Sequence, residues 1–549
     1  MDYYVGVDVG TGSARAALVS ADGKLIKTAV QPIETFNPVP DFYEQSSDDI
    51  WSAVRRVVKT IISDIPASCV KGIGFDATCS LVALDEAGAP VSVSLTGNDK
   101  QNVILWLDHR AEAEAVYINM LGHKLLRYVG GKISLEMEIP KILWLKKNLP
   151  ASWARAKLLF DLPDFLTWKA TNSESRSRCS LVCKWNYSAS PDGNNGWNAE
   201  FLQEIGLSAL REDQWRRIGN VVKSPGDAVG SGLSTKAAAE LGLEEGTPVG
   251  CSLIDAHAGA LGMLGYAHSW SSEFRNNHKK IRFAGLICGT STCHMLLSDK
   301  ETFVEGVWGP YYGAIVEGFW LSEGGQSATG KLLDHVIDTH PASSQIRTKI
   351  FGKKHIQQYL SELLQSMADQ KNYPDISYLT KDIHVWPDYH GNRSPLADPT
   401  LQGMISGLSL AADEENLAVL YLATMQALTY GTRHILEALT KSGHKIEAIL
   451  ICGGLSQNPL LVQSQADVLG LPVLIPNERE SVLIGSAILG ACAAGSFPSL
   501  HKAVRAMGGK ASVVKPRNVS YQFHNRKYRV FKKMVADQLE YKRIMNEAT

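Results

Sequence analysis

The amino-acid sequence predicts an α/β protein built from two related lobes. At 549 residues the chain is too long for one ordinary hydrophobic core, so two large domains are expected. Alternating valines near the start of the sequence predict a strand that opens a β-meander, and the same pattern of strand, glycine and hydroxyl-rich turn recurs near Gly289. We therefore expect a first lobe at residues 1–262, a second at 263–500 and a tail at 501–549.

The first lobe opens with three predicted strands. Valines at every second position from Val5 to Val9 predict a strand whose opposite face carries Asp8. Two further strands, at residues 16–19 and 24–30, complete the meander.

A helix and two more strands are predicted next. Residues 47–63 have the spacing of an amphipathic helix, and residues 72–75 and 81–84 are predicted strands on either side of a polar bend at 76–80. A helix-rich region follows, in which residues 141–145 are expected to contribute to the core.

The second lobe repeats the opening design and then departs from it. Residues 286–291 again predict an apolar strand, a glycine and a hydroxyl-rich turn, and residues 343–381 predict a helical insertion. The basic tail from residue 502 ends in a helix with Phe531, Met534, Val535 and Leu539 on one face. This spacing favours a helix docked on a lobe, and an arm for nucleic acid or membrane is the alternative.

The overall composition excludes several classes of protein. Hydrophobic residues make up 45% of the chain, charged residues 20%, and the formal net charge is −1, so no global charge favours nucleic acid or an anionic membrane. We see no transmembrane run and no signal-peptide pattern. The nine scattered cysteines, Cys179 and Cys183 among them, match neither a zinc pair nor a disulfide framework. A cytoplasmic protein with reduced thiols is expected.

The turn after the first strand is a candidate phosphate site. Gly12 allows the backbone to approach phosphate oxygens closely, and the hydroxyls of Thr11 and Ser13 can donate to them. Asp8 at the strand end can hold Mg²⁺ through water, and Arg15 adds a positive charge. An ordinary hairpin turn explains the same residues, because glycine and serine are common in turns.

A second turn of this kind, at Gly289, Thr290 and Ser291, favours the phosphate interpretation. A nucleoside triphosphate held between two lobes needs a phosphate-gripping hairpin from each lobe, and the two turns supply both. A P-loop at residues 325–331 is a competing interpretation. However, its lysine is followed by Leu332, so the hydroxyl that binds Mg²⁺ is missing.

Asp255 is the candidate general base. Transfer of a phosphoryl group to a hydroxyl needs a carboxylate within hydrogen-bond reach of the attacking oxygen, and positioning supplies most of the rate. Asp255 ends a strand of small residues and opens a predicted helix. Aspartate is also a preferred N-cap residue, so the structural role is compatible, and spacing alone does not select Asp255 among the aspartates.

Two segments are candidate contacts for substrate hydroxyls. Residues 104–110 are predicted to form a strand with an aromatic wall, an acceptor and a donor on one face, namely Ile104, Trp106, Asp108 and Arg110. A strand-edge ion pair beside a half-buried tryptophan explains that face equally well. The bend at Thr78, Cys79 and Ser80 is either a second polar contact or a simple turn. A lone histidine such as His257 is more often structural than a ligand.

Paired glycines in the second lobe are candidates for the nucleoside end of the nucleotide. Residues 449–452 predict an apolar strand that runs into Gly453 and Gly454, where a flat base and ribose can lie against the backbone. Asn458 is available for the adenine edge. Glycine-rich turns are common, so this motif alone is weak.

Taken in order along the chain, the motifs resemble those of the FGGY carbohydrate kinases. Six or more motifs in the same order are more specific than any one motif. The shared pieces are D-x-G-T-x-S-x-R from Asp8, W-x-D-x-R from Trp106, residues 140–145, Asp255 before Ala256 and His257, residues 288–291, residues 323–326, and Gly453 and Gly454 with Asn458. Two glycines followed by Leu455 stand where three glycines are usual.

The resemblance implies two ribonuclease-H-like lobes of the actin and hexokinase ATPase type around a central cleft. It also implies ATP and Mg²⁺ as co-substrates, with Asp255 as general base and Asp8 and Asp255 at the metal. The implied nucleotide contacts are Thr11, Gly12, Ser13, Arg15, Gly289, Thr290, Ser291, Gln326, Gly453, Gly454 and Asn458. The implied sugar contacts are Thr78, Cys79, Ser80, Trp106, Asp108, Arg110, Asp255 and His257.

The segment from Thr78 to Val82 resembles the branch of the family that phosphorylates D-ribulose. It replaces the Gln-Met-His-Gly of xylulokinases and the Arg-Glu pair of glycerol kinases. We therefore expect D-ribulose and ATP to give D-ribulose 5-phosphate, with ribitol, L-ribulose and D-xylulose as rivals, since a few polar contacts set stereochemical choice. The resemblance also implies a small sugar as partner and a possible homodimer. No nucleic-acid or membrane partner is expected, because the charge balance favours neither.

A protein of another class, a non-catalytic ATP-dependent switch as in actin or the Hsp70 chaperones, is the alternative on the same fold. Asp255, the polar bend at residues 78–80 and the Trp106 face argue against it, because a switch needs no sugar pocket.

Overall fold

The structure is a computed structural model that describes residues 2–267 and 282–547. A five-stranded sheet forms the base of the first lobe, in the order β11-β5-β1-β2-β3. Its strands are β1 (Tyr3–Val9), β2 (Ser13–Ser20), β3 (Leu25–Pro32), β5 (Val70–Ala77) and β11 (Val249–Ile254). β1, β5 and β11 are parallel, and β2 is antiparallel to β1 and β3. The predicted meander is confirmed.

One face of this sheet is covered by helices of the first lobe. The predicted amphipathic helix is α1 (Ser47–Ile62), which packs on β2 and β3. The Ser46 side chain accepts a hydrogen bond from the Asp49 backbone N–H and so caps this helix. The other helices near this sheet are α5 (Leu162–Thr171) and α8 (Thr235–Leu241).

A four-stranded sheet lies beside the first, in the order β4-β7-β6-β8. Its strands are β4 (Glu44–Gln45), β6 (Leu81–Leu84), β7 (Val103–Ile104) and β8 (Leu158–Asp161). The helices around it are α2 (Glu112–Leu121), α3 (Glu138–Asn148), α4 (Pro150–Arg155), α6 (Arg178–Lys184) and α7 (Ala199–Glu204), with the two-stranded pair β9 (Arg176–Ser177) and β10 (Val222–Lys223). The strand predicted at 104–110 is wrong, because β7 ends at Ile104 and turns follow.

The second lobe is built on a seven-stranded sheet, in the order β14-β15-β13-β12-β18-β19-β20. Its strands are β12 (Phe283–Cys288), β13 (Thr292–Ser298), β14 (Trp308–Tyr312), β15 (Trp320–Gln326), β18 (Ala448–Cys452), β19 (Val473–Pro476) and β20 (Ala511–Val514). The antiparallel hairpin of β12 and β13 beside the parallel strands β18 and β19 repeats the arrangement of β1 and β2 beside β5 and β11. The two lobes therefore share one design.

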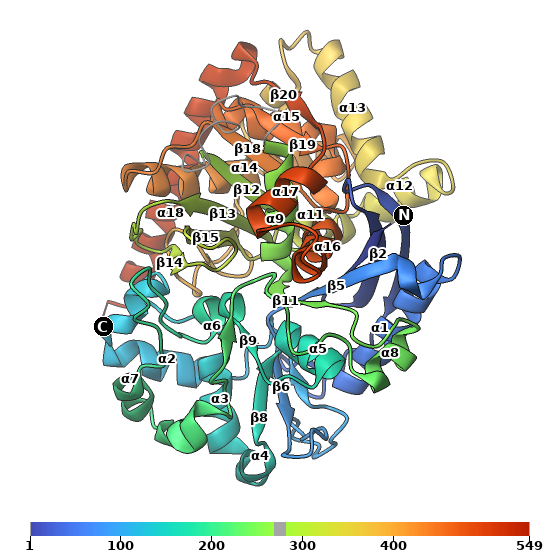
Figure 1. Ribbon diagram of the computed structural model, residues 1–549. Helices are drawn as coiled ribbons and strands as arrows, with labels where there is room; N and C mark the ends of the chain where they lie inside the picture. Colours follow the sequence, from blue (N-terminus) through green and yellow to red (C-terminus); the bar gives the residue numbers. More distant parts are fainter. Residues whose placement is uncertain (1, 268–281, 548–549) are drawn as a thin grey trace.

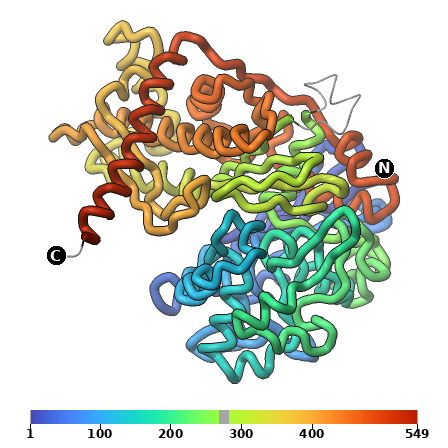
Figure 2. Tube along the Cα trace, turned by 90° about the vertical axis from the view of Figure 1, so that its left-hand side faces the viewer, coloured from blue at the N-terminus to red at the C-terminus, as the bar shows by residue number. Residues whose placement is uncertain are grey.

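The second lobe has its own helical layer. α14 (Glu414–Lys441) contacts α11 (Gly330–Thr339), α13 (Ile356–Gln370) and α15 (Pro459–Leu469). The predicted insertion contains α12 (Ser343–Ile350) and α13. The tail helix α18 (Tyr521–Met545) runs along the outside of this lobe (Figure 2).

The predicted apolar face of the tail helix is largely buried. Phe531, Met534 and Val535 pack with Trp386 on β16 (His384–Trp386), which pairs with β17 (Met404–Ser406), whereas Leu539 is 47% exposed. The helix is thus docked on the second lobe. Residues 548 and 549 of the predicted tail lie outside the described residues.

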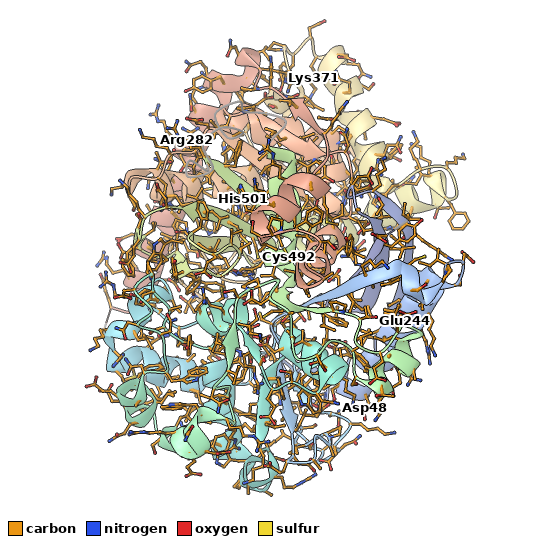
Figure 3. All side chains as sticks on the ribbon, in the orientation of Figure 1. Asp48, Glu244, Arg282, Lys371, Cys492 and His501 are labelled. Atoms are coloured by element: carbon orange, nitrogen blue, oxygen red, sulfur yellow. The ribbon has the colours of Figure 1, made fainter. Side chains whose placement is uncertain are left out.

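Two helices form a layer between the large sheets. α9 (Asp255–Ala267) and α16 (Ser481–Ala493) pack on each other, and α16 also packs on β1, β5 and β11 (Figure 1). Figure 3 labels Cys492 on α16 and His501 on the neighbouring α17 (Leu500–Met507). The expected division of the chain assigns α16 to the second lobe, yet this helix lies on the sheet of the first.

Glycines allow this close packing. A Cβ at Gly485 of α16 would lie 2.0 Å from the Ala258 carbonyl oxygen of α9, and one at Gly74 of β5 would lie 2.0 Å from the Ser486 carbonyl oxygen. Backbone therefore rests directly on backbone at both contacts. Among the described residues no helix is long and apolar enough to cross a membrane.

Candidate functional site

Three carboxylates meet at the carboxyl ends of neighbouring parallel strands. Asp8 of β1 stands opposite Asp76 of β5 in the register, and Asp255 directly follows β11, the next strand in the sheet. The carboxyl ends of parallel strands are where α/β proteins place their ligands. The strand order therefore assembles an acidic site from three distant parts of the sequence.

A cavity of about 290 Å³ lies over the carboxyl ends of these strands, called the acidic edge below, and both lobes line it. Its first-lobe residues are Asp8, Gly10, Thr11, Arg15, Thr78, Cys79, Trp106, Glu136, Lys184, Ile254, Asp255 and Ala256. Its other residues are Ile287, Cys288, Gly289, Thr290, Ser291, Cys293, Glu323, Arg393, Gly453, Gly454 and Val482. Most of the residues predicted for phosphate, metal and base thus share one cavity.

The two predicted phosphate turns have matching geometry. The Gly10 N–H donates to the Ser13 carbonyl at 3.0 Å in the first, and the Gly289 N–H donates to the Ser291 carbonyl at 2.8 Å in the second. Gly12 and Ser13 belong to the first turn but do not line the cavity. A Cβ at Gly12 would meet nothing within 4 Å, so no neighbouring atoms cover that position.

The paired glycines after β18 also face the cavity. Gly453 has a φ of 86°, and a Cβ there would lie 2.4 Å from the Cys288 carbonyl oxygen, so only glycine fits. A Cβ at Gly454 would meet nothing within 4 Å. This turn therefore offers bare backbone beside the second phosphate turn.

Arg15 neutralises part of the acidic edge. Its Nε donates to Asp8 Oδ2 at 2.8 Å, and its Nη1 lies 2.9 Å from Glu480 Oε2. Asp8 above all raises the pKa of Arg15. The guanidinium is held by two carboxylates, which fixes its position at the cavity wall.

Asp76 is the fully buried member of the acidic edge. Ser486 Oγ donates to Asp76 Oδ2, which ties β5 to α16. Burial, and then the negative charge of Asp8, raise the pKa of Asp76 well above its ordinary value. A neutral Asp76 places no second negative charge beside Asp8.

The electrostatics of Asp255 suit a base that works near neutral pH. Removal from water, and then the charge of Asp8, raise the pKa of Asp255 to about 6. Its Oδ1 accepts a hydrogen bond from the Ala256 backbone N–H at 2.7 Å at the start of α9. The carboxylate is therefore held by the helix end and is ionised above about pH 6.

Trp106 links the predicted sugar segment to the first phosphate turn. Its Nε1 donates to Thr11 Oγ1 at 3.0 Å, and both side chains line the cavity. Thr78 and Cys79 line the cavity as well, whereas Ser80 is buried behind them, with its Oγ 3.2 Å from Thr78 Oγ1.

Asp108 and Arg110 do not line the cavity. They form a buried ion pair in which Arg110 also donates to Glu44 Oε1 at 2.8 Å, while Asp108 accepts the Tyr43 backbone N–H at 2.6 Å. The Arg110 guanidinium lies 4.3 Å from the centre of the Phe42 ring. This network fixes the turns that carry Trp106.

Three other predicted contacts also lie outside the cavity lining. Gln326 Nε2 donates to the Leu428 carbonyl at 2.9 Å, and Asn458 caps α15 through its Oδ1. The buried His257 has its Nε2 3.5 Å from Glu323 Oε2, and burial lowers the pKa of His257 to about 4. His257 therefore lies beside the cavity-lining Glu323, whereas the side chains of Gln326 and Asn458 bond to α14 and α15.

Two ion pairs at the cavity were not predicted from the sequence. Lys184 Nζ lies 3.4 Å from Glu323 Oε1, and Arg393 Nη2 lies 2.7 Å from Glu136 Oε1. Burial alone would raise the pKa of Glu323, but Lys184, His257 and Arg393 together lower it. Lys184 is a charged residue at the end of an apolar run in α6, and this local pattern could have indicated it as a functional residue. No local sequence pattern marks Arg393 or Glu136.

The residues present fit a nucleotide with a divalent cation. Two glycine-containing turns, the bare backbone at Gly454 and the fixed charge of Arg15 face one space, which suits a chain of phosphates. Asp8 and Asp255 supply the carboxylate oxygens that Mg²⁺ prefers.

Comparisons with known proteins agree with this geometry. The chain matches the N-terminal domain of the FGGY family of carbohydrate kinases over residues 3–262 and the C-terminal domain over residues 284–494. It is 50% identical over 545 residues to the FGGY carbohydrate kinase domain-containing protein of Xenopus laevis, covering 99% of this chain and 98% of that one.

Two further matches are more distant. The D-ribulokinase YDR109C of Saccharomyces cerevisiae is 42% identical over 536 residues, which covers 93% of this chain and 75% of that one. A structure of Plasmodium falciparum glycerol kinase with ADP aligns with a TM-score of 0.74 at 13% identity, over 97% of this chain and 98% of that one. The two-lobed α/β fold is shared with that kinase, and the family matches span both lobes. The chain therefore belongs to the FGGY family of carbohydrate kinases.

Proposed function

We propose that this carbohydrate kinase transfers the γ-phosphoryl group of ATP to a terminal hydroxyl of D-ribulose, giving D-ribulose 5-phosphate and ADP. The observation that carries the proposal is the convergence of Asp255, Asp8 and two phosphate-type turns on one cavity that both lobes line. The bond that forms joins the sugar oxygen to the γ-phosphorus, and the bond that breaks joins that phosphorus to the β,γ-bridging oxygen.

Asp255 takes the proton of the attacking hydroxyl. Its pKa of about 6 leaves it ionised near neutral pH yet basic enough to accept a proton. The carboxylate is anchored to the first turn of α9, so it meets the hydroxyl without further ordering. The backbone of the turns at residues 10–12 and 289–291 binds the phosphates, and Arg15 offers positive charge beside them.

Asp8 and Asp255 would hold Mg²⁺, which when bound neutralises charge on the phosphates. The raised pKa of Asp76 favours its neutral form, so Asp76 adds no second negative charge beside Asp8.

Polar groups on the other side of Asp255 are suited to the sugar. Lys184 and Glu323 form a buried donor and acceptor pair, and Thr78 adds a hydroxyl. Trp106 supplies an apolar wall on this side of the cavity. Stereochemical choice would come from these few contacts.

The identity of the sugar has separate support. The segment at residues 78–82 resembles the D-ribulose branch, and the match with a protein named D-ribulokinase covers 93% of this chain. Ribitol, L-ribulose and D-xylulose are the rivals. The test is steady-state kcat/KM with MgATP on these four compounds. D-Ribulose is expected to give the highest value, and a higher value for any rival would overturn the choice of sugar.

A further inference from the structure

A cluster of two thiols and one imidazole lies directly behind the sugar side of the cavity. Cys179 and Cys183 stand one helical turn apart on α6, and His257 comes from the first turn of α9. Their ligand atoms all lie within 4.8 Å of one another, and all three side chains have 0% exposure. The spacing of the two cysteines alone gives no zinc pattern, because the third ligand, His257, lies 74 positions after Cys183 in the sequence.

Two separations at the cluster are close to the edges of a tetrahedral zinc site. Zinc bonds of about 2.3 Å to sulfur and about 2.0 Å to nitrogen or oxygen give ligand-to-ligand edges of roughly 3.3–3.8 Å. Cys183 Sγ lies 3.3 Å from His257 Nε2, and Glu323 Oε2 lies 3.5 Å from the same nitrogen. Cys183, His257 and Glu323 therefore already form two edges of the tetrahedron that zinc requires.

Hydrogen bonding leaves the cluster incompletely satisfied. One N–H at His257 Nε2 cannot serve both the sulfur of Cys183 and the oxygen of Glu323. Within the described part of the chain, Glu323 Oε2 has no hydrogen-bond partner although Glu323 is 2% exposed. A buried carboxylate oxygen without a partner is costly. Glu323 lies beside His257 but outside the group whose ligand atoms are all within 4.8 Å of one another, so its side chain would have to move toward the sulfurs to become a fourth ligand.

The surroundings of Glu323 also suit a ligating carboxylate. Its other oxygen, Oε1, lies 3.4 Å from Lys184 Nζ, so the carboxylate is oriented from behind. Carboxylates that bind metals are commonly held in this way by a second hydrogen-bonding group.

We propose that Cys179, Cys183, His257 and Glu323 form a zinc-binding site. Binding exchanges two thiol protons for one Zn²⁺, so two protons leave to solvent as the two zinc–sulfur bonds form, while the imidazole and the carboxylate bind without losing a proton. Sulfur and imidazole ligands distinguish this site from the oxygen-only pair at Asp8 and Asp255, which suits Mg²⁺.

Zinc at this site has a consequence for the kinase, and this consequence rests on the proposed function whereas the binding itself does not. Occupancy commits Glu323 Oε2 to the metal, so this oxygen can no longer accept a hydrogen bond from a sugar hydroxyl. We expect Zn²⁺ to raise KM for D-ribulose by about fivefold or more, the worth of one hydrogen bond, with a smaller change in kcat.

The test uses cobalt as a spectroscopic probe of the full-length protein in reducing buffer. Co²⁺ bound by two thiolates gives a near-ultraviolet charge-transfer band and the visible bands of tetrahedral cobalt, which Mg²⁺-type oxygen sites do not give. We expect both sets of bands at one Co²⁺ per chain and their loss when Zn²⁺ is added. Absence of the charge-transfer band would overturn the proposal.

Variants assign the bands to the cluster. Cys179→Ser and Cys183→Ser are each expected to weaken Co²⁺ binding by at least about tenfold. The matched control is Cys69→Ser, which changes a half-buried cysteine in another part of the first lobe and should bind Co²⁺ like the wild type. Undiminished bands in the Cys179→Ser, Cys183→Ser double variant would overturn the assignment.

A measurement on the wild type covers the case in which the serine variants do not fold. X-ray absorption of the zinc-loaded protein should show two sulfur neighbours at about 2.3 Å and two lighter neighbours at about 2.0 Å. A shell of oxygen and nitrogen alone would exclude the site. If zinc binds as described but KM for D-ribulose is unchanged, the metal site stands and the role of Glu323 at the sugar is wrong.

Discussion

Arg393 and Glu136, 257 residues apart in the sequence, form a 2.7 Å ion pair across the cavity. Glu136 precedes α3 of the first lobe, and Arg393 follows β16 of the second, so the pair joins the two lobes at the mouth of the proposed active site. Arg393 is 8% exposed and also lies close to Cys293. The pair is thus positioned to hold the lobes in a closed arrangement.

Glu136→Gln is expected to weaken both the fold and the reaction. Removal of one partner leaves the other charge buried, which costs about 3 kcal/mol in the free energy of unfolding. We also expect kcat/KM to fall by at least about tenfold, because closure of the two lobes positions the reactants. Urea unfolding and steady-state kinetics measure the two effects. Asp99→Asn, at the exposed pair with Arg155, is the control and should cost under about 1 kcal/mol. Equal effects of the two variants would contradict this role for Glu136.

Trp106→Phe tests the link between the sugar segment and the first phosphate turn. The variant keeps an aromatic wall but removes the hydrogen bond from Nε1 to Thr11 Oγ1. We expect KM for ATP to rise about fivefold, which corresponds to about 1 kcal/mol for one hydrogen bond. Thr11→Val should produce the same change, and the double variant should be no worse than either single one. Additive effects would show that the two residues act independently.

The pH dependence of the rate should report Asp255. Because burial and Asp8 raise its pKa to about 6, the carboxylate becomes protonated as the pH falls through that value and can no longer accept a proton. We expect kcat/KM to fall about tenfold per pH unit below pH 6 and to be flat just above it. An acid limb centred near the ordinary aspartate value of about 3.9 would contradict the assignment of the base.

Gly485→Ala tests the contact of backbone with backbone between α16 and α9. The added Cβ would lie 2.0 Å from the Ala258 carbonyl oxygen, so the helices must separate. We expect a loss of at least about 2 kcal/mol in the free energy of unfolding, and a lower kcat because α9 carries Asp255. Gly196→Ala is the matched control, since a Cβ there meets nothing within 4 Å. Wild-type stability of Gly485→Ala would contradict the close packing.

Local sequence patterns predicted the strands, turns and helix on which the candidate site residues lie, whereas the choice of Asp255 as base depended on the resemblance to a family. Each phosphate turn lies between two strands with clear period-2 spacing, and Asp255 lies where a strand of small residues becomes a helix. Their meeting in one cavity follows from strand order, because β1, β5 and β11 are neighbours. The repeat of the opening pattern near Gly289 was enough to indicate two lobes.

Residues whose role depends on a distant partner could not be found in this way. Lys184 meets Glu323 across 139 positions, and no short pattern encodes that pair. The strand predicted at 104–110 failed for a related reason. Asp108 accepts hydrogen bonds from the Arg110 and Tyr43 backbone N–H groups, so turn geometry prevails over the alternating pattern.

The most direct test of the proposed function is the product formed from D-ribulose and MgATP by the wild type and by Asp255→Asn. We expect the wild type to release one ADP for each D-ribulose 5-phosphate, identified by mass and by the position of the phosphate. Asp255→Asn should still bind ATP while its kcat falls by about 10²–10⁴-fold. Release of ADP that does not depend on the sugar, or unchanged turnover in Asp255→Asn, would contradict the account.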